Sequence, residues 1–185
     1  IYGGDENSAD SDGSNDVIDY SQSLSGMVVN LSKTGSYTLS NEVVINFATQ
    51  TATGEDTDRL YDIQDIIGSS SQDTLVGDAS VNSILAGGDN DIIIGGAGAD
   101  ILVGEAGNDT ILGGLDGDNI YGGTFDGTNH TNIGNDTVDY KNTPAFTSTT
   151  GVTVNLNTTA TQTVSSELGN DTLTSIENIN GTAFK

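Results

Sequence analysis

Aliphatic residues in the middle of the chain recur every nine residues, each preceded by glycines and an aspartate. The blocks Gly95–Val103 and Gly104–Leu112 align with Gly at positions one and four, Asp at position six and an aliphatic residue at position eight. Eight successive blocks fit this frame, with Asp at position six in six of them and an aliphatic residue at position eight in seven. Position six holds Asp73, Asn82, Asp91, Asp100, Asp109, Asp118, Gly127 and Asp136. A fixed period of this kind predicts a repeat architecture.

Each block predicts one tight turn followed by one short strand. Glycine permits backbone conformations with positive φ, and the aliphatic residues after each Asp favour an extended strand. Two blocks then form one coil of a flattened solenoid, and stacked coils pair as parallel strands about 4.8 Å apart. The predicted fold class is all-β, a parallel β-roll with flanking β-strand segments packed on it. Asp91 would lie under Asp109, so that a column of carboxylates runs along each edge of the roll.

The segments outside the nonapeptides predict further strands. Val152, Val154 and Leu156 alternate with polar residues, as do Met27, Val29 and Leu31. We expect both segments to pack on the outward, apolar ninth positions of the roll, and a neighbouring module is the alternative cover. The ninth positions are Val76, Ile94 and Leu112 on one sheet and Leu85, Val103 and Tyr121 on the other. Residues 60–67 predict coil or a capping turn.

A second, longer repeat relates the two ends of the chain. Ile1–Gly4 recurs as Ile120–Gly123, Asn15–Tyr20 as Asn135–Tyr140, Gly26–Leu31 as Gly151–Leu156, and Leu60–Gly68 as Leu173–Gly181. We therefore expect a piece of a tandem array of such modules. The expected division is the tail of a preceding module at 1–20, a β-strand connecting segment at 21–67, the nonapeptide roll at 68–139, and the start of a second connecting segment at 140–185.

Composition excludes several classes of protein. The 185 residues include 27 Asp and Glu against 4 Lys and Arg, for a net charge of −23, and no cysteine. This charge repels phosphate backbones, so we expect no nucleic-acid partner. No apolar run approaches the roughly 18 residues that a membrane span needs, so we expect no membrane insertion. The single histidine, His130, has no Ser or carboxylate placed as a partner, and we expect no enzyme.

The distribution of charge indicates a bound cation. From Leu60 to Tyr140 there are 14 acidic residues and no Lys or Arg. Stacked carboxylates repel one another unless a cation is supplied from outside. Oxygen-only ligands, carboxylates and turn carbonyls, suit Ca²⁺ rather than zinc or copper, while Mg²⁺ prefers a stricter octahedron with several waters. A solvated acidic face is the alternative, but it does not explain the glycine–aspartate–aliphatic register.

The blocks from Ala86 to Tyr121 resemble the Gly-Gly-x-Gly-x-Asp-x-(aliphatic)-x nonapeptide of RTX proteins, the hemolysin-type calcium-binding repeat. Gly95–Val103 has every defined residue, and Gly104–Leu112 departs only at Glu105. The flanking blocks depart further, with Asp89 and Asp116 in place of the glycine at position four.

The resemblance implies a right-handed parallel β-roll with several Ca²⁺ ions between stacked turns. The ions would be bound by position-six aspartates and turn carbonyls, with Asp89 and Asp116 as extra ligands. The candidate metal ligands are Asp73, Asp89, Asp91, Gly95, Ala97, Asp100, Gly104, Ala106, Asp109, Gly113, Asp116, Asp118 and Asp136. Asn82 and Gly127 lack the carboxylate, so we expect weak sites or none there.

Calcium would also decide where the chain folds. Strands this short bury little apolar surface against a backbone entropy cost of roughly 1–2 kcal/mol per residue, so we expect folding only in calcium-rich extracellular surroundings. The resemblance implies export of the unfolded chain through a type I secretion channel to the exterior or to a bacterial cell surface. The predicted function is a monomeric, structural calcium-binding module of a large adhesin, in contact with neighbouring modules of its own chain. The alternatives are a module appended to a secreted enzyme, and a glycan- or ice-binding module.

Overall fold

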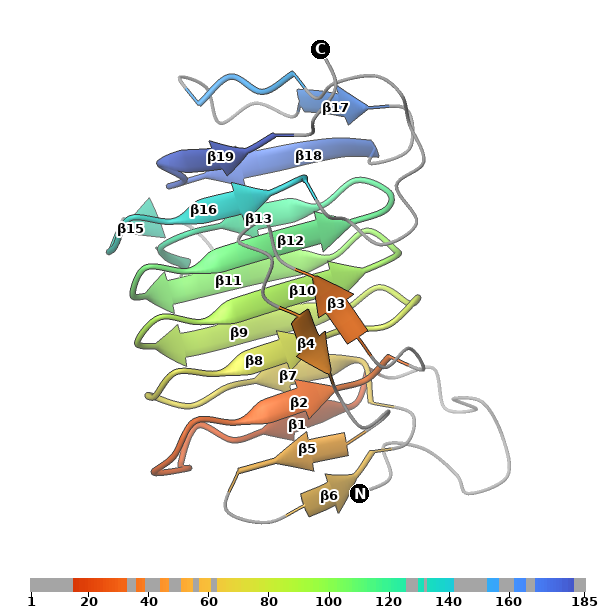
Figure 1. Ribbon diagram of the computed structural model, residues 1–185, viewed down its shortest axis with the longest axis vertical. Coiled ribbons are helices and arrows are strands. Elements are labelled where there is room, and N and C mark those ends of the chain that lie inside the picture. Colours follow the sequence, from red (N-terminus) through yellow and green to blue (C-terminus); the bar gives the residue numbers. More distant parts are fainter. Residues whose placement is uncertain are drawn as a thin grey trace.

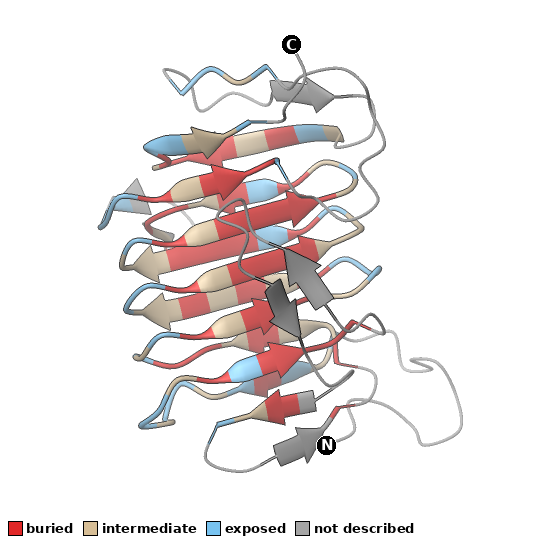
Figure 2. Cartoon of the chain, viewed as in Figure 1, coloured by how far each residue is buried: buried red, intermediate tan, exposed pale blue. Residues whose placement is uncertain are grey.

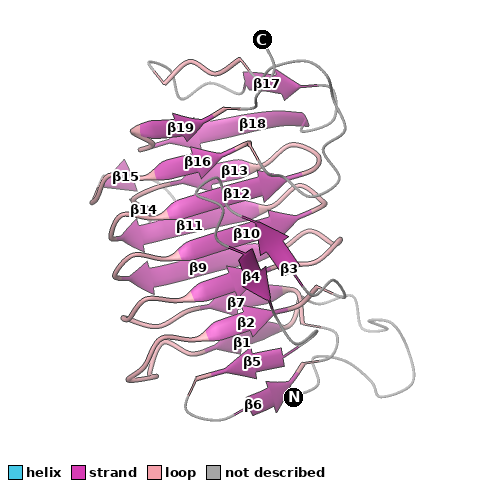
Figure 3. Cartoon of the chain, viewed as in Figure 1, coloured by secondary structure: helices cyan, strands magenta, loops and turns pink. Residues whose placement is uncertain are grey.

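The computed structural model describes residues 15–32, 36–38, 44–46, 51–54, 57–60, 63–125, 130–131, 133–141, 153–156, 162–165 and 169–181. Every regular element in these ranges is a β-strand (Figure 3), so none of the described residues forms a helix that could cross a membrane. The strands stack as successive coils along the long axis of the molecule (Figure 1). They form two main sheets and two small hairpins.

The central strands of the two main sheets come from alternate nonapeptides. The seven-stranded sheet has the order β1 (Val17–Asp19), β7 (Asp65–Ile67), β9 (Ser83–Gly88), β11 (Ile101–Ala106), β13 (Asn119–Tyr121), β18 (Gly169–Thr174) and β17 (Gln162–Ser165). The eight-stranded sheet has the order β19 (Asn178–Asn180), β16 (Thr137–Asp139), β12 (Thr110–Gly114), β10 (Ile92–Gly96), β8 (Thr74–Val76), β2 (Val28–Asn30), β5 (Thr51–Thr53) and β6 (Thr57–Arg59).

The pairing within the nonapeptides is parallel and in the predicted register. Ile92 pairs with Thr110 in one sheet, and Ile101 pairs with Asn119 in the other, each two blocks further along the chain. Only the outermost strands depart from this pattern, because β5, β6 and β17 pair antiparallel. The predicted parallel β-roll with flanking strands is therefore confirmed.

The core lies between the two sheets and consists of the position-eight side chains. These residues, in seven consecutive rungs, have no exposed surface: Leu75, Ile84, Ile93, Leu102, Ile111, Ile120 and Val138. Burying each of them contributes about 1.5–3 kcal/mol. Figure 2 shows this burial along the central strands, with exposed residues concentrated in the turns.

A second apolar cluster lies on the outer face of the eight-stranded sheet. Val76, Ile94 and Leu112 are at most 1% exposed, and they point away from the core because successive strand residues alternate between faces. The hairpin of β3 (Ser36–Thr38) and β4 (Val44–Asn46) is drawn in front of this sheet in Figure 1. The burial of these side chains shows that the chain itself covers them, but segment 27–31, which we predicted as part of the cover, lies in the main core instead. On the other sheet Val103 is buried, and the hairpin of β14 (Thr124–Phe125) and β15 (His130–Thr131) lies beside β11.

Three predictions about the connecting segments are wrong. Val29 does not pack on the outside of the roll, because β2 pairs parallel with β8 and Val29 is buried in the main core opposite Leu75. Alternation alone does not distinguish a covering strand from one more coil of the roll. Residues 65–67, predicted as coil, form β7, and the buried Ile66 pairs with Ile84 of β9. Residues 153–156 of the second predicted strand are not a strand, although Val154 packs against the core.

The two copies of the longer repeat make equivalent strand pairs. β1 pairs parallel with β7 and matches Val17 with Asp65. β16 pairs parallel with β19 and matches Thr137 with Asn178, the equivalent residues of the second copy. The division of the chain into modules stays a prediction.

Candidate metal centre

The position-six side chains form two buried columns, one at each edge of the roll. The first column is Asp73, Asp91, Asp109 and Asp136, and the second is Asn82, Asp100, Asp118 and Asp171; each is at most 1% exposed. The columns arise because every second turn falls at the same edge of the stacked coils. The predicted juxtaposition of Asp91 with Asp109, and of Asp100 with Asp118, is present.

One oxygen of each central carboxylate is held by the neighbouring coil. The backbone N–H of Asp73 donates to Oδ1 of Asp91 at 2.7 Å, and the N–H of Asp91 donates to Oδ1 of Asp109 at 2.8 Å. Asp109 donates in the same way to Asp136 at 2.9 Å. The second column repeats the arrangement from Asn82 to Asp100, Asp118 and Asp171 at 2.9–3.0 Å. This ladder fixes the orientation of each carboxylate.

The second oxygen of the central carboxylates has no hydrogen-bond partner. Oδ2 is buried and unpaired in Asp91, Asp100, Asp109, Asp118 and Asp136. A buried carboxylate oxygen without a compensating partner is costly, and a bound cation is one way to satisfy it. The same unpaired atom recurs in five turns, so the feature belongs to the repeat.

For Asp100, Asp109 and Asp118, the space beside the unpaired oxygen is kept open by a glycine at position one. A Cβ atom on Gly95 would overlap both Oδ2 of Asp100 and the carbonyl oxygen of Gly113 in the next coil. A Cβ on Gly104 would overlap Oδ2 of Asp109 and approach the carbonyl oxygen of Gly122 in the same manner. A carboxylate oxygen and a main-chain carbonyl oxygen therefore converge on one small space, which is the donor set that Ca²⁺ prefers.

The turns keep their conformation where the sequence departs from the repeat. Asp89, Glu105 and Asp116 have φ of 71°, 70° and 72°, in the left-handed region otherwise occupied by the repeat glycines. Asp tolerates this region better than most residues. The departures thus leave the backbone of the turn in place.

Burial raises the pKa of the aspartate carboxyl groups in the two columns. Desolvation is the main cause, partly offset by the backbone hydrogen bonds to Oδ1, and it raises the pKa of Asp91 and Asp118 to about 8 and that of Asp100 to about 7. The pKa values of Asp109 and Asp136 rise to about 6 for the same reason. Near neutral pH these groups would bind either protons or a cation.

Side chains alone do not complete a metal site in this region. The described residues bring no three His, Cys, Asp or Glu side chains together around one point. A cation at either column would therefore need main-chain carbonyl oxygens in addition to one or two carboxylates. The residues present fit a hard, oxygen-binding ion.

Comparison with known proteins identifies the repeat. Residues 67–102 and 94–128 match the RTX calcium-binding nonapeptide repeat (4 copies). The chain carries RTX calcium-binding repeats. No curated protein matches it. The RTX match spans β8 to β13 and includes four of the five aspartates with an unpaired Oδ2, and Ca²⁺ is the ion that these repeats bind.

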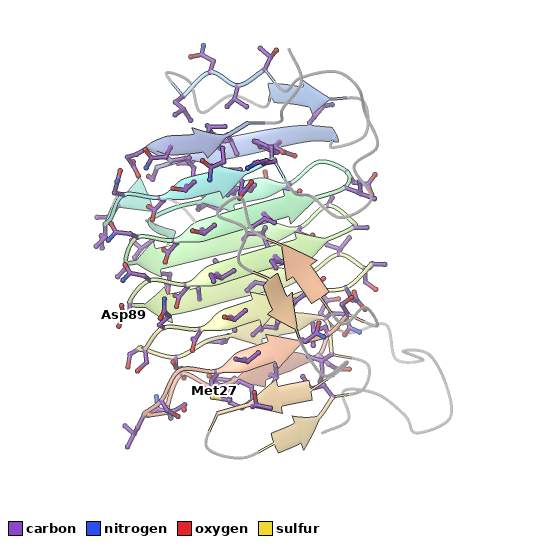
Figure 4. All side chains as sticks on the ribbon, in the orientation of Figure 1. Met27 and Asp89 are labelled. Atoms are coloured by element: carbon purple, nitrogen blue, oxygen red, sulfur yellow. The ribbon has the colours of Figure 1, made fainter. Side chains whose placement is uncertain are left out.

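Two predicted ligands lie away from the columns. Asp89 and Asp116 are exposed at the tips of RTX turns, and Figure 4 shows Asp89 at the rim of the roll. Asp116 Oδ2 accepts a hydrogen bond from the N–H of Gly98 at 3.3 Å, and Asp89 Oδ1 accepts one from the N–H of Asn90 at 2.8 Å. Their role as extra ligands stays a prediction.

The predicted carbonyl ligands lie in the turns beside the columns. Gly95, Gly104 and Gly113 are buried, and Ala97 and Ala106 are half-buried. The N–H of Ala97 donates to the carbonyl of Asp78 at 2.9 Å, which ties this turn to the coil before it. Their coordination of an ion stays a prediction.

Sequence reasoning missed Asp171, the last member of the second column. Its Oδ1 accepts from the N–H of Asp118, and its Oδ2 accepts from the hydroxyl of Tyr140. The signal was present, because Asn170–Leu173 repeats the order Asn-Asp-Thr-aliphatic of Asn108–Ile111. The insertion before it breaks the nine-residue count.

Proposed function

We propose that this chain is a structural module that folds when Ca²⁺ binds outside the cell, and that it serves as an extender segment of a large secreted or surface adhesin. The observation that carries the proposal is the row of unpaired, buried Oδ2 atoms on five aspartates of stacked turns. Such a row disfavours the folded chain unless metal ions or protons neutralise it.

The ligands fall into two sets along the two edges. Asp91, Asp109 and Asp136 supply carboxylate oxygens at one edge, and Asp100 and Asp118 supply them at the other. Turn carbonyls complete the coordination, from residues such as Gly95, Ala97, Gly104, Ala106 and Gly113. An ion between two coils neutralises the carboxylates and joins the coils, so several ions act together along the roll.

Binding energy of this kind couples folding to location. A site present at 100 times its dissociation constant adds about 2.7 kcal/mol to the stability of the folded state. Extracellular calcium modules bind at about 10⁻⁴–10⁻³ M, a range reached outside the cell and not in cytosol. The chain would stay unfolded during export by a type I secretion system and fold after release.

The architecture supports an extender role. The coils stack along one axis (Figure 1), and the longer repeat makes the same strand pair twice. Modules of this type joined in tandem would form a stiff rod that separates an anchor from a binding tip. The role is non-enzymatic, and the module works as a monomer beside its neighbours in the same chain.

Circular dichroism during a calcium titration tests the proposal. We expect a coil-like spectrum in chelator and a β-sheet spectrum at millimolar Ca²⁺, with a much smaller response to Mg²⁺ at the same concentration. A fully folded spectrum in chelator, or one that stays coil-like at millimolar Ca²⁺, would refute the proposed function.

A further inference from the structure

Three of the four ends of the two columns differ from the centres, whereas Asp136 at the fourth end keeps an unpaired Oδ2. In the central turns each aspartate has one satisfied and one unpaired oxygen. At the ends, the side chains of Asp73, Asn82 and Asp171 are satisfied by donors that belong to the protein itself. All three are at most 1% exposed, so water does not replace these donors.

Hydrogen bonds from Met27 and Ser69 satisfy both carboxylate oxygens of Asp73. Its Oδ1 accepts from the N–H of Met27 at 2.6 Å and from the hydroxyl of Ser69 at 2.9 Å, and its Oδ2 accepts from the N–H of Ser69 at 2.5 Å. Asn82 is satisfied in a similar way at the other edge. Its Oδ1 accepts a hydrogen bond from the N–H of Asp78 at 2.8 Å. In both turns a backbone N–H that satisfies the position-six side chain belongs to the residue at position two.

The backbone angle φ at position two differs between turns whose position-six side chain is satisfied and turns whose Oδ2 is unpaired. Position two has positive φ in the turns that precede Asp91, Asp100, Asp109 and Asp118, including Glu105 at 70°. Ser69 and Asp78 are not among the described residues with positive φ. Among the turns whose position-two residue the structure describes, only these last two have a position-two N–H that satisfies the position-six side chain.

At the other end of the second column, Tyr140 satisfies the second carboxylate oxygen of Asp171. Its hydroxyl, carried by the residue that follows β16, donates to Oδ2 of Asp171 on β18 at 2.8 Å. Both side chains are 1% exposed. Asp171 thus has the same ladder bond to Oδ1 as Asp100 and Asp118, but a phenol hydroxyl occupies the side where the central turns are unpaired.

We propose that Ser69 takes the place of Ca²⁺ at one end of the first column and Tyr140 at one end of the second, so that the ions are confined to the five carboxylates with an unpaired Oδ2. The inference rests on the proposed function. It assigns Tyr140 and Ser69 as positioning residues, removes Asp73 from the predicted set of ligands, and leaves Asp171 outside it. At the opposite end of the first column Asp136 keeps an unpaired Oδ2 and stays a ligand.

Calcium stoichiometry tests the assignment at Asp171. Isothermal titration with Ca²⁺ compares the unmodified chain with D118N and with D171N, which make the same chemical change in adjacent members of one column. We expect D118N to lower the number of bound ions, and D171N to leave it unchanged because its amide can still contact the Tyr140 oxygen. Loss of an ion in D171N equal to that in D118N would overturn the proposal.

The hydroxyl itself is tested by Y140F in urea titrations at saturating Ca²⁺. A buried carboxylate oxygen that loses its donor should lower the folding equilibrium constant roughly tenfold. In the D171N background the same substitution should have a clearly smaller effect, since the charge is gone. Equal effects in the two backgrounds, or none in either, would overturn the proposal. If the unmodified chain does not respond to Ca²⁺, the proposed function fails instead.

Discussion

The two oxygens of each central aspartate have different roles. Oδ1 accepts a backbone hydrogen bond from the adjacent coil and belongs to the fold, whereas Oδ2 is buried without a partner. An Asn in the same place keeps the first role through its amide oxygen and loses the charge needed for the second. Substitution of Asp by Asn therefore separates folding from ion binding.

The variants D100N and D109N should each require more calcium to fold. Losing one site that is filled at 100 times its dissociation constant costs about 2.7 kcal/mol, so the calcium midpoint measured by circular dichroism should rise. D19N is the matched control, because Asp19 is exposed on β1, outside the RTX match. A midpoint that rises equally in D19N would show an effect of net charge alone.

The raised pKa values predict that protons partly replace calcium. In chelator the folded state keeps the carboxyls of Asp91 and Asp118 protonated up to about pH 8, whereas their ordinary value is 3.8. The folded state therefore binds more protons across this window, and the free energy of unfolding falls as the pH rises through it. We expect more β-sheet signal in chelator at pH 5.5 than at pH 8.

The double variant D91N/D118N provides the control for this pH dependence. It removes the two groups with the highest pKa, so the change in signal between pH 5.5 and pH 8 should be smaller than in the unmodified chain. A pH response of unchanged size would assign the effect to other groups. Sedimentation velocity at each pH confirms that the signal comes from a monomer.

At the scale of elements, the turns depend on glycine because of what lies beside it. Gly104 cannot carry a Cβ without displacing Oδ2 of Asp109. Gly88 could carry one, since its nearest neighbour, the carbonyl oxygen of Ser70, would lie at 3.5 Å, an ordinary contact. Both glycines lie in RTX turns at the same edge of the roll, Gly104 buried at position one and Gly88 half-buried at position three.

We therefore expect G104A to impair calcium-dependent folding and G88A to be tolerated. The Cβ of G104A would push the carboxylate away from the carbonyl oxygen of Gly122, so both the fold and the ion site should suffer. Thermal unfolding at saturating Ca²⁺ measures the difference. Equal melting temperatures for the two variants would contradict the assigned geometry.

The nine-residue period predicted the roll, its register and both columns, because turn, ligand and core residue occur in every block. It did not predict β7, whose block keeps the nine-residue spacing but has Gln64 in place of the aspartate and lacks the repeat glycines, or Asp171, which lies beyond an insertion that interrupts the count. Nor did it distinguish Asp73 from Asp91, which have the same place in the repeat. That difference depends on Ser69 and Met27, and on backbone geometry that composition does not reveal.

For the whole molecule, calcium removal should change its dimensions as well as its spectrum. An unfolded chain of 185 residues has a radius of gyration of roughly 45 Å, and a folded chain of this length has less than half that value. We expect small-angle X-ray scattering to show the larger value in chelator and the smaller one in millimolar Ca²⁺. Equal radii in the two conditions would mean that calcium does not control compaction.

The ladder from Asp109 to Asp136 spans 27 residues, whereas the ladder from Asp91 to Asp109 spans 18. One edge of the roll thus accommodates extra chain without any change in strand pairing. A peptide epitope or affinity tag inserted after Gly123 should therefore be tolerated at that edge, where the folded module would display it without loss of the roll.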